Sequence, residues 1–550
     1  MKPLANEIKS VWMTTFEAKP FAKVGGLGEV PPNLSRGLVS LGVKATIIMP
    51  THGTVEGRSQ LELEGCGLVY IREWKGVRFL LVGGGPLSRP GVYDPASLKE
   101  KIYAFSKCVE QLLLKHEKLG VEEPDIVHFH DWHSVFALLR AKIVREAENL
   151  PIKFVYHVHL LTREKISLSD VVQAGLDPER EHVVSYKGKK LKITIREAVE
   201  MSKGLAERLG ALEADRFVTV SRTYLREDRD GVLNSLGWDL ENKGSYVYNG
   251  TDWRYEASLK EVLEKHGEKA KEFLGKDEFE RNDLRRYFLL KALGEIPKGE
   301  PRVLDEKLKN KLEQLYAPPY LPDGRVESFS DDGPLAIMTG RIATQKGINI
   351  LLEAIPLVLR KIGNAKFVLL LLPVWGSEEY LEPLVKTVRT YPENVRVIFG
   401  IAPSIFKLAH VSADVFVAPS LWEPFGIMAL EGMVTGNPVV ASKVGGLKEI
   451  VLDVREHDAS GTGLHVTPGD PIELAQGISD LMLVMEASRT ESTMIVTKIE
   501  DAELANLLFT NLKLGSELRK SAIKRVEEEF TWTKAAEMAL NVYRSIRNKL

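Results

Sequence analysis

The chain has 550 residues, more than the roughly 250 to 300 that one hydrophobic core usually fills, so two large domains are expected. Its 44% hydrophobic and 27% charged residues are typical of a globular protein and exclude a disordered chain. Because 74 Lys and Arg nearly balance 76 Asp and Glu, the net charge of -2 excludes bulk attraction to nucleic acid or to an anionic membrane.

The amino terminus and the cysteines indicate a cytoplasmic location. The first residues carry charges at Lys2, Glu7 and Lys9 and lack the apolar run of an export signal. The longest apolar run, residues 367–375, is shorter than the ~20 residues that a membrane-spanning helix needs. Two cysteines cannot form a disulfide framework, so Cys66 and Cys108 are predicted to be core residues in a reducing compartment.

The first 253 residues alternate β-branched runs with helical patterns, which predicts βαβ units. A strand pattern in KSVWMTTF is followed by the amphipathic LGEVPPNLSRGLVSLG and by a second strand pattern in VKATIIMP. DIVHFH, KFVYHVH, RFVTVS and SYVYNG continue the alternation, and each ends in polar residues. Since ligands bind outside the carboxyl ends of parallel strands, these polar ends are candidate site positions.

A second doubly wound domain is predicted for residues 333–530, with strands in PLAIMTGR, KFVLLLLP, VRVIFG, DVFVAPS and NPVVASK. Residues 254–332 are charged and favour helices, which predicts an insertion of amphipathic helices. Its part from Pro301 to Asp332 is expected either to pack on the second domain or to contact another subunit. Residues 531–550 have apolar side chains at helical spacing and predict a final helix that needs a surface to pack on.

The pentapeptide KVGGL occurs at residues 23–27 and again at residues 443–447, each time where a strand is expected to hand over to a helix. Paired glycines there allow backbone amides to approach a ligand, and the helix amino terminus that follows favours phosphate. Taken alone, the glycine pair is better explained by a tight strand-to-helix turn, so the neighbouring motifs decide.

Two further motifs place charged residues near the amino-terminal ends of helices predicted in the second domain. In TGRIATQKG, Arg341 and Lys346 converge on one helix start, where two cations would hold a diphosphate and stabilise it as a leaving group. In EPFGIMALE, Glu423 ends a strand and Glu431 lies in the second turn of the next helix. Carboxylates at these positions would accept hydrogen bonds from the hydroxyl groups of a sugar or a ribose.

At this point the sequence resembles the glycogen and starch synthases, which are retaining glycosyltransferases of the GT-B fold. The resemblance covers nearly the whole chain and depends on ordered motifs. These are KVGGLGEV, RPGVYD at 89–94, HFHDWHS at 128–134, TVSRTYLRE at 219–227, NGTDW at 249–253, TGRIATQKG at 339–347 and EPFG with its E-x7-E. It implies two Rossmann-like domains facing across a cleft, with the final helix crossing back to the first domain.

The family implies transfer of glucose from a nucleotide diphosphate-glucose to the non-reducing end of an α-1,4-glucan, with no cofactor and no metal. The donor would be ADP-glucose or UDP-glucose, because His159-Leu160-Leu161 and the complete E-x7-E are closer to the fungal and animal branch than to bacterial members. The backbone carbonyl of His159 would face the reacting carbon, and the leaving phosphate would take the acceptor's proton. The implied catalytic residues are His159, Arg341, Lys346 and Glu423. The implied substrate-binding residues are Lys23, Gly25, Gly26, Tyr93, Asp131, Trp132, Asn249, Glu431, Gly445 and Gly446.

Several other interpretations compete with this one. His128 and His130 share one face of a strand and, with the nearby YHVH, offer metal ligands, although no cysteine supports a metal site. The D-x-D of residues 228–230 lies in a charged run and is better explained as a solvated helix face. A sugar-nucleotide epimerase, another retaining glycosyltransferase and a non-catalytic glucan-binding protein share the fold. A glucan phosphorylase would need a longer chain with a cofactor-bearing lysine motif.

Overall fold

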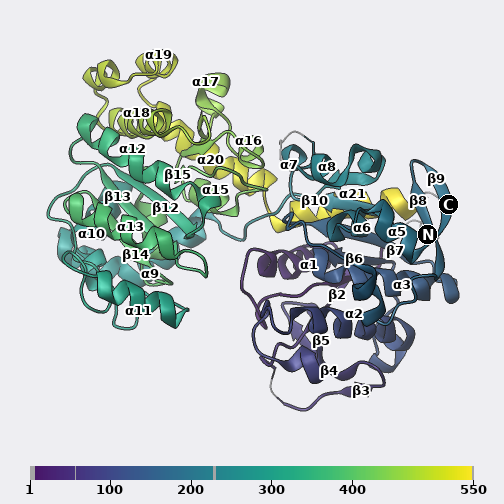
Figure 1. Cartoon of the computed structure of the whole chain (residues 1–550). Helices are drawn as coiled ribbons and strands as arrows, with labels where there is room; N and C mark the ends of the chain where they lie inside the picture. Colours follow the sequence, from purple (N-terminus) through teal and green to yellow (C-terminus); the bar gives the residue numbers. More distant parts are fainter. Residues whose placement is uncertain (1–6, 56, 227–230, 548–550) are drawn as a thin grey trace. The chain divides into compact units, whose positions relative to one another are not determined.

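The computed structural model describes residues 7–55, 57–226 and 231–547, so the D-x-D at 228–230 lies outside the described residues. The chain forms two compact units, the first made of Met1–Gly250 with Thr531–Leu550 and the second of Thr251–Phe530. Each unit has a central sheet with helices packed against it (Figure 1). The α/β class with two Rossmann-like units is therefore confirmed.

The sheet of the first unit has the strand order β11-β10-β7-β6-β1-β2-β5-β4-β3. Neighbouring strands from β11 to β5 are parallel, and six of them are the strands that the sequence predicts. The antiparallel extension β5-β4-β3 was not predicted, nor was the separate hairpin β8-β9. The strands are β1 Ser10–Thr14, β2 Lys44–Pro50, β3 Leu61–Leu63, β4 Gly67–Trp74, β5 Val77–Gly83, β6 Ile126–His130, β7 Lys153–Val158, β8 Glu181–Tyr186, β9 Lys189–Thr194, β10 Arg216–Thr219 and β11 Gly244–Tyr246.

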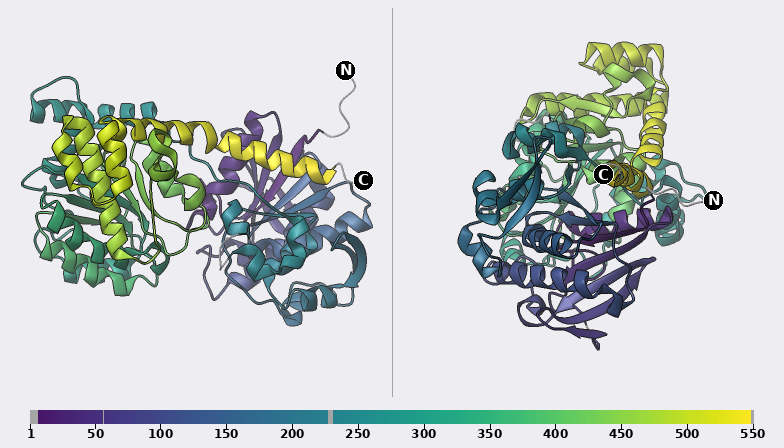
Figure 2. Two further views of the ribbon diagram at one scale, coloured as in Figure 1. Left: turned by 90° about the horizontal axis from the view of Figure 1, so that it is seen from above. Right: turned by 90° about the vertical axis from the view of Figure 1, so that its right-hand side faces the viewer.

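The final helix α21 (Trp532–Arg547) belongs to the first unit, where it packs on α1 (Val30–Ser40) and β7 (Figure 2). Its predicted apolar stripe, from Trp532 to Tyr543, is buried. A Cβ at Gly37 of α1 would lie 2.4 Å from the carbonyl oxygen of Trp532, so glycine is needed for this close approach. The remaining helices are α2 Leu98–Lys115, α3 Val135–Ala147, α4 Leu168–Gln173, α5 Ile195–Met201, α6 Ala206–Glu213, α7 Arg222–Arg226 and α8 Val232–Leu236.

The expectation for the cysteines is wrong, because the structure joins Cys66 and Cys108 in a disulfide. Cys66 lies in the tight turn between β3 and β4, and Cys108 lies on the buried face of α2. The unexpected antiparallel extension carries this turn onto α2. Cysteine number and spacing alone therefore could not reveal the pairing.

The second unit has an all-parallel sheet with the order β14-β13-β12-β15-β16-β17. Its strands are continuous apolar runs because helices cover both faces of the sheet. The strands are β12 Leu335–Arg341, β13 Lys366–Leu372, β14 Val395–Phe399, β15 Val415–Ala418, β16 Val439–Ser442 and β17 Gly463–Val466. The helices from residue 348 onward are α12 Ile348–Lys361, α13 Glu378–Thr390, α14 Phe406–Ser412, α15 Ile427–Val434, α16 Leu447–Ile450, α17 Val454–His457, α18 Pro471–Thr490, α19 Ala502–Thr510 and α20 Leu514–Glu529.

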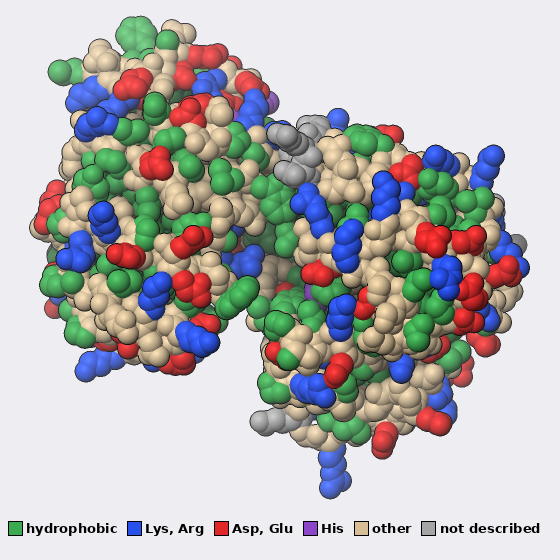
Figure 3. Space-filling view, viewed as in Figure 1, with side chains coloured by type: hydrophobic (Ala, Val, Ile, Leu, Met, Phe, Trp, Pro, Cys, Tyr) green, Lys and Arg blue, Asp and Glu red, His purple; other side chains and the backbone are tan. Residues whose placement is uncertain are grey.

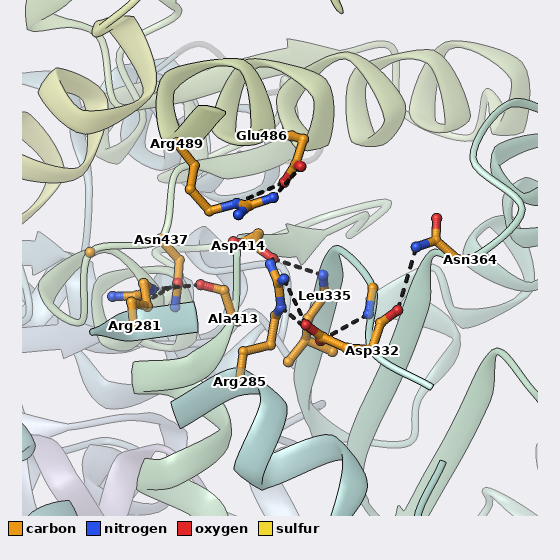
Figure 4. Close-up of polar contacts among 12 residues, drawn as sticks. Arg281, Arg285, Asp332, Leu335, Asn364, Ala413, Asp414, Asn437, Glu486 and Arg489 are labelled. Carbon is orange, nitrogen blue, oxygen red and sulfur yellow. Dashed lines mark hydrogen bonds and ion pairs between the residues drawn. The ribbon is translucent and has the colours of Figure 1, made fainter. Parts of the chain in front are cut away.

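Residues 254–332 contain α9 (Tyr255–Leu274), α10 (Arg281–Leu290) and α11 (Glu306–Leu315), which lie within the second unit. Arg285 of α10 bonds to Asp332 at 3.1 Å and to Asp414 at 2.8 Å, which ties this segment to the start of β12 and β15 (Figure 4). Burial alone would raise the pKa of Asp414, but the guanidinium groups of Arg285 and Arg519 lower it. A buried carboxylate is stable here because it is paired.

The part from Pro301 to Asp332 packs on the edge of the same sheet. Arg302 forms a β-bridge with Ile401, and the hydroxyl of Tyr320 donates to the carbonyl of Val397 in β14 at 2.9 Å. Leu308 and Leu312 of α11 are buried, whereas Leu315 is half-buried. The segment thus covers its apolar side chains on its own unit, and contact with a second subunit stays a prediction.

The surface bears no dominant charge on the face that Figure 3 shows, where acidic and basic side chains are interspersed. None of the helices in the described parts of the chain has the length and apolarity needed to cross a membrane.

Candidate functional site

In the first unit, the loop between β1 and α1 is organised by Glu17, which is 1% exposed. Its Oε2 accepts hydrogen bonds from the backbone amides of Val24 at 2.5 Å and Gly25 at 2.9 Å. The Tyr93 hydroxyl donates to Oε1 of the same carboxylate at 2.8 Å. Glu17 therefore joins two of the predicted motifs, KVGGL and RPGVYD. Glu17 was not predicted from the sequence, although a carboxylate directly after a predicted strand was the available signal.

The KVGGL loop itself is exposed at Lys23, Val24 and Gly26. The Lys23 ammonium lies 2.5 Å from the carboxylate of Glu29, which also pairs with Lys19. Burial alone would raise the pKa of Glu29, but hydrogen bonds from the two lysines lower it. Because Lys23 is 46% exposed, this pair adds little stability and leaves the ammonium available to a ligand.

Asp131 follows β6 at its carboxyl end, and the structure places it against His159 at the end of β7. Its Oδ1 accepts the backbone amide of His159 at 2.8 Å, and its own amide donates to the carbonyl of His157 at 2.9 Å. Burial raises the pKa of Asp131 to about 8, against the lowering effect of hydrogen bonds from the backbone amides of His159 and Leu160. With φ of 56°, Asp131 adopts a backbone conformation that is uncommon outside glycine and recurs at functional sites.

The carbonyl oxygen of His159 accepts no hydrogen bond from the described residues. Burial lowers the pKa of the His159 ring to about 3, so the ring is neutral at physiological pH. Trp132 stands directly after Asp131 and is half-buried, with its ring 4.3 Å from that of His133. The end of β7 thus presents a backbone carbonyl and a neutral imidazole.

Asn249 follows β11 and is the remaining predicted site residue of the first unit. It is 6% exposed, and its Oδ1 has no hydrogen-bond partner among the described residues. Buried polar atoms are nearly always bonded, so an orphaned acceptor at the end of a strand indicates a place for a donor such as a hydroxyl. No hydrogen bond or ring contact with a described residue links the Asn249 side chain to the other predicted residues.

In the second unit, Lys346 and Glu423 form an ion pair with Nζ and Oε2 2.5 Å apart. The two side chains are 13% and 9% exposed, so the pair is poorly screened by solvent. Lys346 lies in a 3-10 turn after β12, and the amide of Leu421 donates to the carbonyl of Gln345 at 2.8 Å. A Cβ at Gly347 would lie 1.9 Å from the carbonyl oxygen of Pro419. The glycine of QKG is therefore what allows the lysine turn to approach the Glu423 loop.

Arg341 is the last residue of β12, at the carboxyl edge of the sheet as predicted. It is exposed and makes no hydrogen bond or ion pair with the described residues. Glu431 lies half-exposed in the second turn of α15, where the sequence analysis expects it. These side chains are positioned on the same edge of the sheet as the ion pair of Lys346 and Glu423.

The second KVGGL loop closes on the Glu423 loop. The Gly446 amide donates to the carbonyl of Glu423 at 3.0 Å. A Cβ at Gly446 would lie 2.4 Å from both the Cα and the carbonyl oxygen of Phe425. Gly445 has φ of 44°, in the left-handed region that favours glycine. The sequence predicts that this glycine pair lets the backbone approach a ligand closely. In the structure, the close contact of Gly446 is with the backbone of Phe425.

Comparison with known proteins divides the chain in the same way. Residues 10–237 match the family model of the starch synthase catalytic domain, and residues 323–490 match that of the glycosyl transferases group 1. A glycogen synthase of Caldicellulosiruptor saccharolyticus is 26% identical over 490 residues, which cover 84% of this chain and 90% of the relative. One of Thermus thermophilus is 27% identical over 460 residues, covering 80% and 86%.

Among solved structures, the catalytic domain of starch synthase IV from Arabidopsis thaliana, bound to ADP and acarbose, has the same fold. Its TM-score is 0.65 at 19% sequence identity, and the match covers 98% of this chain and 100% of that one. The sucrose-phosphate synthase of Thermosynechococcus elongatus matches with a TM-score of 0.53 at 18% identity over 98% of each chain.

Proposed function

We propose that this chain, which belongs to the glycogen and starch synthase family of glycosyltransferases, is a glycogen synthase. It transfers glucose from a nucleotide diphosphate-glucose to the non-reducing end of an α-1,4-glucan and retains the α configuration. The curated relatives that match over most of the chain carry this name. The matches to both units support a complete donor and acceptor machinery within the one chain.

The observation that carries the proposal is the buried ion pair of Lys346 and Glu423 at the sheet edge where β12 ends with Arg341, an exposed residue without an ion-pair partner among the described residues. A diphosphate that binds here would take Lys346 and Arg341 as its cations and free Glu423 for the hydroxyl groups of the donor glucose. Glu431 would hold the ribose. Cations fixed in advance of the reaction stabilise the negative charge that develops on the leaving diphosphate.

In the first unit, Lys23, Gly25 and Gly26 would approach the donor, and Tyr93 would hold their loop through Glu17. Asp131, His159 and Asn249 would line the glucose pocket, with Trp132 beside them. Burial raises the pKa of Asp131 and so favours its protonated form, which could donate a hydrogen bond to a sugar hydroxyl. The orphaned Oδ1 of Asn249 can accept one.

The reaction would proceed on the front face of the donor. The acceptor hydroxyl oxygen forms a bond to the anomeric carbon while the bond from that carbon to the diphosphate breaks. The hydroxyl proton passes to the departing phosphate oxygen, and the free carbonyl of His159 faces the carbon as positive charge develops on it. Catalysis then consists of positioning and charge stabilisation, without a covalent sugar-enzyme intermediate.

The test supplies purified protein with a maltooligosaccharide and either ADP-glucose or UDP-glucose, and measures nucleotide release. We expect release with at least one donor, and proton NMR of the first product to show an α linkage. A β-linked first product would refute retention, and no release with either donor would refute the synthase. Interconversion of nucleotide sugars without a glucan would instead favour an epimerase.

The donor nucleotide is left to this experiment. The starch synthase IV structure was bound to ADP, whereas His159-Leu160-Leu161 resembles the fungal and animal branch. Donor specificity should therefore be measured as the ratio of the kcat/KM values for ADP-glucose and UDP-glucose, because activity with one donor alone does not define it.

The proposed location is the cytoplasm, and the proposed oligomer contact is the exposed side of residues 301–332. Leu304 supports that contact, because it is 63% exposed beside a segment whose other apolar side chains are largely covered. Light scattering of Leu304→Asp tests it: a lower mass than wild type supports the contact, and an equal mass removes it. Thiol titration of the denatured protein from fresh lysate tests whether Cys66 and Cys108 are paired there.

A further inference from the structure

Three buried histidines gather beneath the end of the first sheet. His128 and His130 lie two residues apart on β6, and His157 lies opposite His130 on β7. Residues with this spacing share one face of a sheet. One ring nitrogen from each of the three lies within 4.8 Å of those of the other two. All three residues are fully buried.

The hydrogen bonds of these rings leave a set of nitrogens unused. Nδ1 of His128 lies 2.7 Å from the hydroxyl of Tyr543, and Nδ1 of His130 lies 2.8 Å from Nε2 of His159. Nε2 of His128, Nε2 of His130 and both ring nitrogens of His157 have no partner among the described residues. Stacking of the rings accounts for their packing but not for four orphaned nitrogens in one place.

The two Nδ1 contacts are compatible with a tautomer that suits metal binding. If each Nδ1 carries the proton and donates it, to Tyr543 or to His159, each Nε2 keeps a free lone pair. Metal-bound histidines are oriented in this way, with the other ring nitrogen donating to a neighbour.

We propose that His128, His130 and His157 bind one divalent transition-metal cation, for which zinc is the chemically matched ion. Imidazole nitrogens suit zinc and its neighbours, whereas magnesium and calcium require oxygen ligands that this set lacks. Three imidazoles leave a fourth position for water or another group. In a zinc site the nitrogens lie about 3.3 Å apart, so the three rings have to converge by about 1.5 Å or less.

The site would join elements that are distant in the sequence. The cation would link β6 to β7 directly, and the bond from His128 to Tyr543 extends the link to α21. The bond from His130 to His159 extends it to the end of β7. The cation therefore has a positioning role, and the inference does not rest on the proposed transferase activity. The proposal differs from the expectation, made from the sequence, that the chain binds no metal.

Metal content tests the proposal directly. Untagged protein is stripped with a chelator, loaded with Zn²⁺ or Co²⁺, desalted and analysed by plasma mass spectrometry. We expect about one equivalent in the wild type and less than about a tenth in His157→Gln. His457→Gln, which alters an exposed histidine of α17 in the second unit, is the matched control and should keep the full equivalent.

Two further measurements separate metal binding from folding. Zn²⁺ should raise the melting temperature of the stripped wild type and of His457→Gln, and leave that of His157→Gln unchanged. If His157→Gln does not fold, X-ray absorption of the cobalt-loaded wild type decides, because it should show three imidazole ligands. No bound metal in the wild type, a full equivalent in folded His157→Gln, or a cobalt shell without imidazoles would each overturn the proposal.

Discussion

The two copies of KVGGL have the same five residues but different surroundings. In the first unit, Lys23, Val24 and Gly26 are exposed, and a Cβ at Gly26 would meet nothing within 4 Å. In the second unit, Gly445 and Gly446 are buried, and a Cβ at Gly446 would overlap Phe425. In both copies the second glycine immediately precedes a helix and has helical backbone angles. The local turn is therefore similar, and the packing around it differs.

The difference shows that one motif can serve two purposes. In the first copy the backbone amides of Val24 and Gly25 donate to the buried carboxylate of Glu17, so the loop is ordered but its outer surface stays open. In the second copy, the absence of a side chain at Gly446 allows the Glu423 loop to pack directly against its backbone. The first is suited to contacting a ligand, and the second to positioning a residue that does.

The largest effect is expected for the lysine that pairs with Glu423. Lys346→Ala should lower kcat about 100- to 1000-fold, because stabilisation of a leaving group by one fixed donor is of that size. Arg341→Ala should act in the same direction. Lys443→Ala is the matched control, since this lysine of the second KVGGL is exposed and lies 3.6 Å from Glu456.

Steady-state kinetics with the preferred donor and circular dichroism of each variant provide the measurement. Lys443→Ala should retain the wild-type rate. If folded Lys346→Ala and Arg341→Ala turn over at the wild-type rate, the proposal that the diphosphate binds at this edge of the second sheet is wrong.

The next effect distinguishes the two glycines directly. Gly446→Ala should lower the free energy of unfolding by about 2 to 3 kcal/mol, because its Cβ overlaps backbone atoms that cannot move aside. Gly26→Ala, in open space with ordinary backbone angles, should change it by less than about 0.5 kcal/mol. Urea unfolding of the two variants measures both values. Equal stability of the two variants would contradict the comparison.

A smaller effect is expected for the carboxylate that holds the first loop. Glu17→Gln should cost about 1 to 2 kcal/mol, since it replaces charge-assisted hydrogen bonds to two amides and to Tyr93 with weaker ones. The KM for the donor should rise as the loop loses its fixed position. Tyr93→Phe removes one of these bonds and should show a fraction of the effect on stability. If Glu17→Gln melts at the wild-type temperature, the loop is held by other contacts.

The smallest effect is expected for Lys23→Ala. Its ion pair with Glu29 is half-exposed, so stability should change by less than about 0.5 kcal/mol. If Lys23 approaches the donor as proposed, kcat/KM should fall about threefold to tenfold and the loss should shrink at high salt. Kinetics at two ionic strengths measure this. A kcat/KM equal to that of the wild type would leave Lys23 without a role in donor binding.

Much of the fold could be predicted because its signals are local. Apolar runs such as residues 367–372 form strands since parallel sheets bury both faces, and the stripe of α21 follows helical spacing. The antiparallel strands β3 and β4 lacked such a signal. β3 has only three residues and β4 is largely half-exposed, so neither strand forms a buried apolar run that marks its pairing partner.

The candidate site also has features that local sequence patterns predict and features that depend on tertiary contacts. The residue types and their order determined that Lys346 and Glu423 follow neighbouring strands, because carboxyl ends of parallel strands meet at one edge. Three contacts could be known only from the tertiary structure. The Glu17 carboxylate accepts the amides of Val24 and Gly25. Gly446 packs against the backbone of Phe425, and Cys66 forms a disulfide with Cys108. The tertiary structure also gathered His128, His130 and His157 with unused nitrogens. A sequence lists side chains in order, whereas these contacts join distant segments through packing that depends on the whole fold.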